Sequence, residues 1–468
     1  MIRIVEAENL NYLFLYTSPD HFKRLKDRLS ARVQNYYFMP SYKNGSWDGK
    51  IYFLYNNGKF FRGLVWEVLK YASEWKIPVE FGINVIYRNL PDSFKLNLKT
   101  ELWERQKEAY DKIRKFNFGL VKMPTGSGKT LVELAIVDEF FHTETGKIAI
   151  IVPRTSLVEQ FYDRFQQFAP DDMKDHVGRF YGGKKEIDKR IVVFTWQSLL
   201  SLKRSKSKKK ILDDFKVLIF DEVHFSKAKE IKSIVTSFTQ AKYRYGFTAT
   251  LPQKDKASLM MIKALFGEVM YEYKLAEAIE EKTLSTMEIQ PIVLEYDYPR
   301  GLTYQEDEEF IAKQDFRYEI LKSVVDNYKD RNVLILVRFV EVAKRIAKEL
   351  GVHLFYGATA MDERKEVLNI FEKNKGVTLV ATLGVFGVGI DVKNVDVLIL
   401  FQPRKSEIEL LQAIGRGLRK RKGKHLLVFD FVDAIPYFSS YFKERLRTYK
   451  REGVKVLKQK VYENNNII

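Results

Sequence analysis

The chain has 468 residues, of which 46% are apolar and 30% charged, and its formal net charge is +18. This composition is typical of a globular protein with a sizeable core, and the lack of cysteine excludes disulfides, cysteine–zinc sites and thiol catalysis. No cleavage signal follows Met1, and no uncharged apolar run is long enough to span a membrane, so we expect a cytoplasmic protein. The positive charge favours a polyanionic partner over a basic surface that serves only solubility.

Residues 1–97 are rich in aromatic side chains and turn signals, which predicts a small α+β domain. Asn57-Gly58 lies between two apolar stretches, Ile51–Tyr55 and Lys59–Phe61, and this arrangement indicates a β-hairpin. Two amphipathic stretches predict helices, at 19–33 and 64–74.

From residue 98 to residue 435, short apolar strands alternate with helical stretches, a pattern typical of parallel sheets covered on both faces. The strands fall into two series, which predict two tandem α/β lobes, 98–285 and 286–435. The first series is 119–123, 148–152, 191–194 and 217–220; the second is 289–294, 333–337, 378–380, 397–400 and 426–429. The remaining residues, 436–468, form a basic tail that is helical in pattern.

A glycine-rich segment, 123–130, follows the first of these strands and opens a predicted helix. Its glycines let successive backbone amides point at phosphate oxygens, which predicts a phosphate-binding loop. The expected contacts come from Thr125, Gly126, Ser127, Gly128, Lys129 and Thr130, with Lys129 on the β/γ-phosphates and the Thr130 hydroxyl on Mg²⁺. Met123 stands where the strict pattern has glycine. The alternative is a glycine turn that only caps a helix.

Two adjacent acids, Asp221 and Glu222, come directly after the strand 217–220. Carboxylates at the end of a buried strand are costly to hold without a cation or a chemical role. We expect Asp221 to bind Mg²⁺ through water and Glu222 to orient and deprotonate the attacking water. The alternative is an acidic helix N-terminus without catalytic function.

These segments and several others resemble, in order, the motifs of superfamily 2 helicases, whose motor has two RecA-like lobes. Residues 102–109 resemble the Q motif, and the resemblance implies that Gln106, with Arg105, contacts the nucleotide. Thr248–Thr250 resembles the motif that couples the ATP site to nucleic acid. The implied cofactors are ATP and Mg²⁺. Other motifs imply contacts to a nucleic-acid strand from Pro153, Arg154, Thr195, Gln197, Arg338 and Thr382, and nucleotide contacts from Gly389 and Asp391.

The last of these motifs contains Gln412, Arg416 and Arg419, which fall on one face of a predicted helix. A guanidinium presented to the γ-phosphate neutralises charge that develops in the transition state, so we expect both arginines and Gln412 to be catalytic. The alternative is a basic surface helix, since Lys420-Arg421-Lys422 continues the run of charge.

The first domain, with Tyr36–Pro40 and Tyr42–Lys50, is similar to that of the UvsW-like helicases of tailed phages. This resemblance implies action on branched or forked DNA (fork regression, branch migration and unwinding) in recombination, repair and replication, alongside proteins of those processes. Trp47 stands between two turn glycines, so its ring either faces outward as a DNA wedge or fills the domain's own core.

Three other functions fit the motor motifs: an RNA helicase, a duplex DNA translocase subunit that does not separate strands, and a binding module with an inactive ATP site. The last is disfavoured because the catalytic residues are present. The basic run 203–210 is either a phosphate-tracking loop or a solvated loop. Direction of movement, preferred junction and oligomeric state are left open by the sequence.

Overall fold

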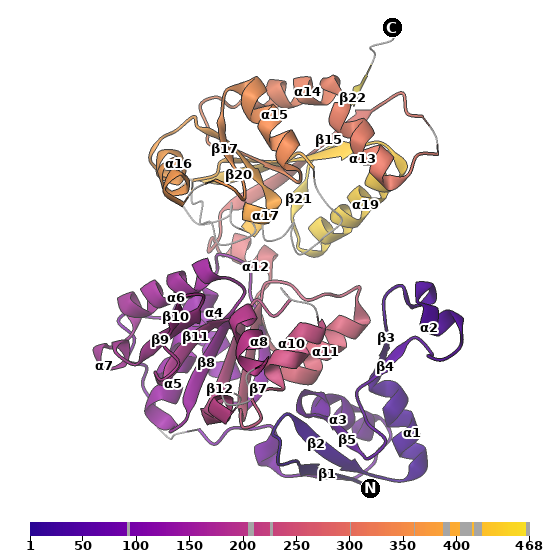
Figure 1. Ribbon diagram of the computed structural model, residues 1–468, viewed down its shortest axis with the longest axis vertical. Coiled ribbons are helices and arrows are strands. Elements are labelled where there is room, and N and C mark those ends of the chain that lie inside the picture. The colour runs from indigo at the N-terminus through magenta and orange to yellow at the C-terminus, as the bar shows by residue number, and fades with distance from the viewer. Residues whose placement is uncertain are drawn as a thin grey trace. The chain divides into compact units, whose positions relative to one another are not determined.

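The computed structural model describes residues 1–90, 94–204, 210–224, 228–299, 301–359, 361–386, 394–402, 414–415 and 424–464. The chain divides into two compact units, one comprising 1–123 and 128–273 and the other comprising 124–127 and 274–468. Each unit contains one large parallel-dominated sheet (Figure 1). Within the described ranges, no helix has the length and apolar character needed to cross a membrane. The boundaries predicted at 97/98, 285/286 and 435/436 stay predictions.

The N-terminal part of the first unit is a small α+β fold, as predicted. Its four strands are ordered β5-β2-β1-β6, with β1 pairing antiparallel to β2 and parallel to β6. The strands are β1 (Ile2–Glu6), β2 (Tyr12–Tyr16), β5 (Lys59–Phe61) and β6 (Val79–Glu80); the helices are α1 (Pro19–Arg28), α3 (Val65–Glu74) and the 3₁₀ turns η2 (Arg62–Leu64) and η3 (Ile83–Val85).

The helix predicted over 19–33 is wrong in its second half. It ends at Arg28, and residues 30–32 form β3 (Ser30–Arg32), which pairs antiparallel with β4 (Lys50–Tyr52). The 51–61 hairpin is only partly right: the turn at Asn57-Gly58 closes, with the Tyr55 amide donating to the Lys59 carbonyl at 2.8 Å. Away from that turn the two strands do not pair with each other: β4 pairs with β3, and β5 pairs with β2.

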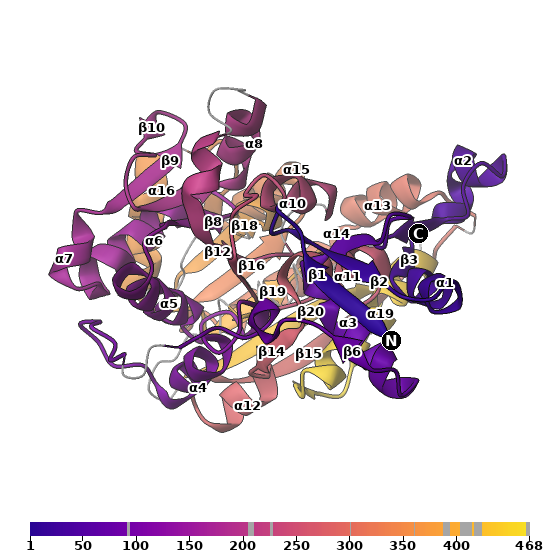
Figure 2. The same ribbon diagram turned by 90° about the horizontal axis from the view of Figure 1, so that it is seen from below.

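Strands β3 and β4, with η1 (Tyr36–Phe38) and α2 (Pro40–Lys43), form what we call the arm, residues 30–52. It projects from the N-terminal sheet in both views (Figures 1 and 2). The arm is therefore a narrow extension that buries little of its own surface, and this leaves several of its aromatic rings exposed.

The large sheet of the first unit has the order β10-β9-β11-β8-β12-β13-β7-β14, and every neighbouring pair except β9/β10 is parallel. The predicted strands of this lobe are confirmed. The strands are β7 (Phe118–Lys122), β8 (Lys147–Val152), β9 (Val177–Tyr181), β10 (Lys184–Lys185), β11 (Ile191–Thr195), β12 (Phe215–Asp221), β13 (Tyr243–Thr248) and β14 (Val269–Glu272). The helices are α4 (Glu104–Ile113), α5 (Lys129–Thr143), α6 (Thr155–Phe168), α7 (Asp171–Lys174), α8 (Trp196–Arg204), η4 (Lys210–Asp214), α10 (Ala228–Val235) and α11 (Lys256–Phe266).

The N-terminal fold is seated directly on this lobe. Its buried apolar side chains belong to the same continuous cluster as those of β7, β12 and α11. The turn η2 and strand β3 both contact α11. The backbone amide of Leu10 donates to the Thr239 carbonyl at 2.9 Å, and Gly63 packs against the carboxyl end of α11. The N-terminal fold and this lobe therefore share one hydrophobic cluster.

The second unit has an all-parallel sheet ordered β17-β18-β16-β19-β20-β15-β21, with β22 also pairing to β15. Its predicted strands are confirmed as well. The strands are β15 (Thr286–Glu295), β16 (Val333–Val337), β17 (His353–Phe355), β18 (Thr378–Thr382), β19 (Val397–Leu400), β20 (His425–Asp433), β21 (Lys455–Val456) and β22 (Lys460–Glu463). The helices are α12 (Leu275–Glu280), α13 (Tyr304–Lys313), α14 (Asp315–Asp326), α15 (Val340–Leu350), α16 (Met361–Lys373), α17 (Leu383–Phe386) and α19 (Pro436–Arg451).

The prediction of a helical tail from residue 436 onward holds only to Arg451. Beyond it, β21 and β22 each add to β15, the strand that opens this unit. The segment becomes extended because an edge of the sheet offers unpaired backbone groups, and local periodicity does not report such a long-range partner. The fold class is thus α/β, with two tandem RecA-like lobes and a small N-terminal α+β domain.

Candidate functional site

The carboxyl edge of the first lobe's sheet collects most of the residues singled out from the sequence. Five neighbouring parallel strands, β11-β8-β12-β13-β7, end there, and each is followed by one of the motifs. Ligands of open α/β sheets bind outside the carboxyl ends of the strands. This edge is therefore the candidate functional site.

The segment after β7 has the backbone of a phosphate loop. Gly126 and Gly128 have φ angles of 89° and 82°, a left-handed conformation that glycine adopts without strain. The Ser127 hydroxyl donates to the Pro124 carbonyl at 2.8 Å, which closes the turn, and α5 begins at Lys129. Thr125 and Thr130 are half-buried beside it. The free amides at the start of a helix of this length suit an anion.

Lys129 joins the loop to the acidic pair. Its Nζ lies 3.4 Å from Glu222 Oε1 and donates to the Met123 carbonyl at 3.3 Å. Glu222 itself has a φ of 53°, an uncommon conformation for a residue with a Cβ. Backbone strain of this kind concentrates at functional sites, where surrounding structure holds it in place.

The surroundings of the two acids shift their pKa values in opposite directions. Burial, and then the charge of Glu222, raise the pKa of Asp221 to about 7. Burial also acts to raise the pKa of Glu222, but Lys129 and His224 outweigh it and leave that pKa below its ordinary value. The pKa of Glu222 is thus the lower of the two, which suits a general base.

The surroundings of Asp221 fit a magnesium ion. Its side chain is buried, and its carboxylate is hydrogen-bonded to the Glu222 backbone amide and to the carboxyl group of Glu133. The described part of the chain has no group of three or more acidic, histidine or cysteine side chains placed to hold a metal. Magnesium is commonly held by one or two protein oxygens together with several waters and the phosphates of a substrate. Thr130 and Asp221 are the residues that would hold it.

Gln106 contacts the phosphate loop. It is buried near the start of α4, where its Nε2 donates to the Gly128 carbonyl at 3.3 Å and its Oε1 accepts from the Trp103 amide at 3.0 Å. Arg105 pairs with Glu108 at 2.9 Å, and its guanidinium lies 5.5 Å from the Tyr273 ring centre. The structure therefore brings Gln106 and the loop together.

The sequence did not assign a role to His224, but the structure gives it one. Its Nδ1 lies 3.4 Å from Glu222 Oε2 and is hydrogen-bonded to the Thr248 hydroxyl. Thr248 in turn donates to the Thr250 carbonyl at 2.6 Å. A chain of contacts thus links the acidic pair to the end of β13. The sequence signal for this link is the presence of a histidine two residues after Glu222.

Of the predicted strand contacts in this lobe, Gln197 is exposed, while Pro153 is buried and Arg154 half-buried at the start of α6. Thr195 is buried, and its hydroxyl bonds the Ser198 hydroxyl at 2.7 Å at the start of α8. The Thr195 side chain is thus engaged in helix capping, and any strand contact from it has to compete with Ser198.

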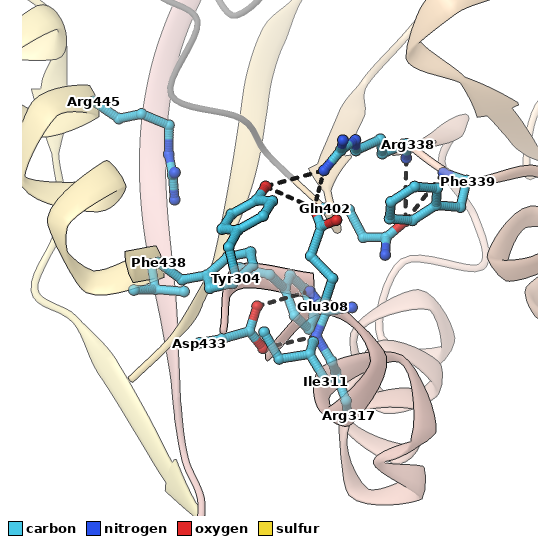
Figure 3. Close-up of a pocket in the computed structure, with 12 residues that line it drawn as sticks. Tyr304, Glu308, Ile311, Arg317, Arg338, Phe339, Gln402, Asp433, Phe438 and Arg445 are labelled. Carbon is cyan, nitrogen blue, oxygen red and sulfur yellow. Dashed lines mark hydrogen bonds and ion pairs between the residues drawn. The ribbon is translucent and has the colours of Figure 1, made fainter. Parts of the chain in front are cut away.

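In the second lobe, Arg338 follows β16 and lines an open pocket of about 460 Å³ (Figure 3). Its guanidinium forms an ion pair with Glu308 and donates a hydrogen bond to the Tyr304 hydroxyl at 3.0 Å. A contact from Arg338 to a nucleic-acid strand therefore has to compete with these two partners. Glu308 and Tyr304 both belong to α13. A fully buried pair, Arg317–Asp433 at 2.9 Å, forms the floor of the pocket. Thr382 is buried at the end of β18.

Five predicted site residues lie outside the described residues: Gly389, Asp391, Gln412, Arg416 and Arg419. Most of the basic run 203–210 also lies outside them.

Trp47 is half-buried in the arm, so its ring is neither fully exposed nor enclosed in the core of the domain. Its indole Nε1 donates to the Lys50 carbonyl at 2.7 Å, which ties the ring to the start of β4. Two residues of the Tyr36–Pro40 segment, to which the sequence assigned no individual role, are more open: Phe38 and Tyr37 are 66% and 50% exposed. Arg32 lies 5.2 Å from the Tyr36 ring centre, so positive charge accompanies these rings.

Three family models match the chain. The Type III restriction enzyme res subunit model matches residues 99–253, and the helicase conserved C-terminal domain matches 316–421. The N-terminal model of DNA helicase UvsW matches residues 5–82.

Curated relatives and solved structures agree with these models. The chain is 28% identical over 463 residues to the ATP-dependent DNA helicase uvsW of Enterobacteria phage T4, covering 92% of this chain and 90% of the relative. It is also 28% identical to DNA 3'-5' translocase XPB2 of Sulfurisphaera tokodaii, over 77% of this chain and 88% of that one. The crystal structure of T4 UvsW matches over 99% of both chains with a TM-score of 0.51 and 23% identity.

Proposed function

We propose that the motor of this chain, which belongs to the UvsW-like group of superfamily 2 helicases, remodels branched DNA. At the coarser level, the protein is an ATP-hydrolysing DNA helicase or translocase. What goes beyond this is the branched substrate, the use of Mg²⁺ and the role of each site residue.

One observation carries the catalytic part of the proposal: Lys129 of the phosphate loop lies 3.4 Å from Glu222 at the edge of the same sheet. In our proposal Lys129 holds the β- and γ-phosphates, and its departure from Glu222 frees that carboxylate to take a proton from water. Bound Mg²⁺ would neutralise charge on the phosphates, held by Thr130 and Asp221. Gln106 and Arg105 would position the base.

The proposal also assigns roles to residues of the second lobe. Arg416 and Arg419 would neutralise charge on the γ-phosphate, with Gln412 on the same helical face, and Gly389 and Asp391 would contact the nucleotide. Strand contacts are proposed for Pro153, Arg154, Thr195, Gln197, Arg338 and Thr382.

The branched substrate is proposed from the arm. A RecA-like motor grips a strand without reading a junction, so a branch preference needs an added surface. Exposed aromatic rings stack on unpaired bases, and nearby Arg and Lys side chains attract the phosphate backbone. Phe38 and Tyr37 supply exposed rings, Arg32 an exposed positive charge, and Trp47 supports the arm beneath them.

The test is ATPase stimulation and product analysis on single-stranded, duplex, forked and four-way DNA, with RNA as comparator. We expect stimulation by DNA over RNA and strand-exchange products from forks and four-way junctions. Lys129→Ala is the negative control and should retain less than a tenth of the ATPase, since one phosphate clamp contributes several kcal/mol in the transition state. Stronger stimulation by RNA would support the RNA helicase, and movement on duplex without strand separation would support the translocase.

A further inference from the structure

The N-terminal sheet, β5-β2-β1-β6, has two faces with different surroundings. Successive residues of β2 point to opposite faces, so Leu13 and Leu15 are buried in the core while Tyr12, Phe14 and Tyr16 lie on the other side, which we call the outer face. Helix α3 packs against the core side, and the view from below shows β1 and β2 in front of it (Figure 2). A largely antiparallel sheet covered on one side is expected to be polar on the other.

The strand register instead places aromatic rings and cations next to one another on the outer face. Residues directly opposite each other on paired strands share a face, so Phe14 neighbours Lys59 of β5. The Tyr55 amide donates to the Lys59 carbonyl at 2.8 Å, which puts Tyr55 on the far side of that lysine. In the adjacent row, Tyr16 pairs with Arg3 of β1. Rings and positive charges therefore alternate across this face.

The apolar and aromatic side chains of the outer face are open to solvent. Tyr16 is 56% exposed, Val5 40% and Tyr55 38%, and Phe14 is half-buried. Aromatic and β-branched residues favour strands in general, which accounts for one or two such positions. A contiguous group of them on one exposed face is typical of a surface that binds a partner.

The charges on the outer face indicate that this partner is a polyanion. Lys59 stands between two of the rings, and its Nζ lies 4.0 Å from the Tyr12 ring centre. Arg3 forms an ion pair with Glu80 at 3.6 Å, in which both side chains are exposed. Exposed pairs contribute little free energy, so a phosphate can take the place of Glu80. Rings that accept a stacked base, combined with cations that accept phosphates, are typical of single-strand binding surfaces.

The spacing of the rings suits an extended single strand. Phe14 and Tyr16 are two positions apart on β2, which separates them by about 7 Å at the usual rise of a strand. This is about twice the base repeat of a duplex, so the bases of an unstacked strand fit this spacing. Four-stranded sheets with exposed rings bind two or three unpaired bases in this way. Strand β4 of the arm ends at Tyr52, three positions before Tyr55, so the arm and the outer face adjoin.

We infer that the outer face of the N-terminal sheet binds an unpaired strand of DNA. Its bases stack on Phe14, Tyr16 and Tyr55, and its phosphates contact Arg3 and Lys59. This is a DNA site separate from the strand contacts proposed for the two lobes. The inference rests on the proposed function, because a forked substrate supplies the unpaired strand.

The test measures binding of the full-length protein to single-stranded oligo(dT) and to blunt duplex DNA by fluorescence anisotropy. Tyr16→Ala and Tyr55→Ala should each weaken oligo(dT) binding about tenfold, as is usual for the loss of one stacked base, and leave duplex binding nearly unchanged. Tyr16→Phe keeps the ring and should bind as wild type does. Trp75→Ala is the matched control and should change neither affinity, because Trp75 is 49% exposed at the end of α3, on the helix side of the same domain.

Two further readouts locate the contact. Lys59→Gln should reduce the slope of log affinity against log salt concentration by about 0.7, the value for one phosphate of a single strand. Oligo(dT) that carries iododeoxyuridine should photocrosslink in the wild-type protein to Phe14, Tyr16 or Tyr55, as identified by mass spectrometry. This crosslink decides the matter if an alanine variant melts at a lower temperature than wild type.

Three results would overturn the inference. They are wild-type oligo(dT) affinity in both alanine variants, crosslinks confined to the two lobes, and a wild-type dimer that the alanine variants dissociate, which would make this face a contact between two copies of the chain. A different result separates the inference from the proposed function. If the alanine variants lose oligo(dT) affinity while wild type shows no preference for forks over blunt duplex, the branched substrate is wrong and the single-strand site stands.

Discussion

Gly63 is the point at which the N-terminal domain touches the backbone of the motor most closely. A Cβ added there would lie 2.2 Å from the Lys263 carbonyl oxygen, 2.7 Å from the Gly267 nitrogen and 2.8 Å from the Ala264 carbonyl oxygen. All three atoms are backbone at the carboxyl end of α11, so no side chain can rotate away. We therefore expect Gly63→Ala to cost about 3 kcal/mol, the upper end for overpacking a tight interior.

The assay for Gly63→Ala is thermal melting combined with ATPase on single-stranded and forked DNA. A cost of about 3 kcal/mol corresponds to a Tm decrease on the order of 5–10 °C for a body of this size. Because the overlap pushes the N-terminal domain away from α11, fork selectivity should fall more than single-strand ATPase. Gly82→Ala is the matched control, since a Cβ there meets nothing within 4 Å. If both variants melt as wild type does, the close seating of the two parts is refuted.

Three further predictions concern the sites. Glu222→Gln keeps the side-chain shape but removes the base, so ATP should bind and hydrolysis stall; lost nucleotide affinity with normal turnover would make Glu222 structural. Phe38→Ala should weaken fork binding by about 1–3 kcal/mol without lowering Tm. Trp47→Ala should lower both the fork affinity and Tm, because the hydrogen bond to the Lys50 carbonyl at 2.7 Å is lost. Fork affinity equal to wild type in Phe38→Ala would contradict stacking. Glu308→Gln should release Arg338 for phosphate and tighten DNA binding two- to fivefold, about 0.5–1 kcal/mol in fluorescence anisotropy; weaker binding would show that the pair instead holds the pocket together.

Local sequence patterns predicted the elements that are determined by their own residues and not by distant pairing partners. Continuous apolar strands gave the two parallel sheets, because burial on both faces demands such runs. The glycine turn after β7 and the adjacent acids at the end of β12 could be located from the sequence because glycine at positive φ and carboxylates at a strand end have few other uses. The extended segments at Ser30–Arg32 and after Arg451 were missed, since their partners, β4 and β15, are distant in sequence.

The side-chain environment of the site could not be predicted in the same way. Arg338 was expected to face a nucleic-acid strand, yet in the structure it is paired with Glu308 of α13, thirty positions earlier in the chain. Burial and pairing are properties of the packed chain, so they appear only once the fold is known.

The seating of the N-terminal domain on α11 limits how these proteins can be recombined in the laboratory. A chimera cut at residue 97 would leave apolar side chains of α11 facing an unrelated surface, because the two parts share one cluster of buried residues. Removing residues 1–97 would likewise expose that surface, so truncation cannot isolate what the arm contributes. A transplant that preserves solubility has to carry η2 together with the carboxyl turn of α11, including the backbone atoms that face Gly63. The exchangeable cassette is therefore discontinuous in sequence although it is a single piece in space.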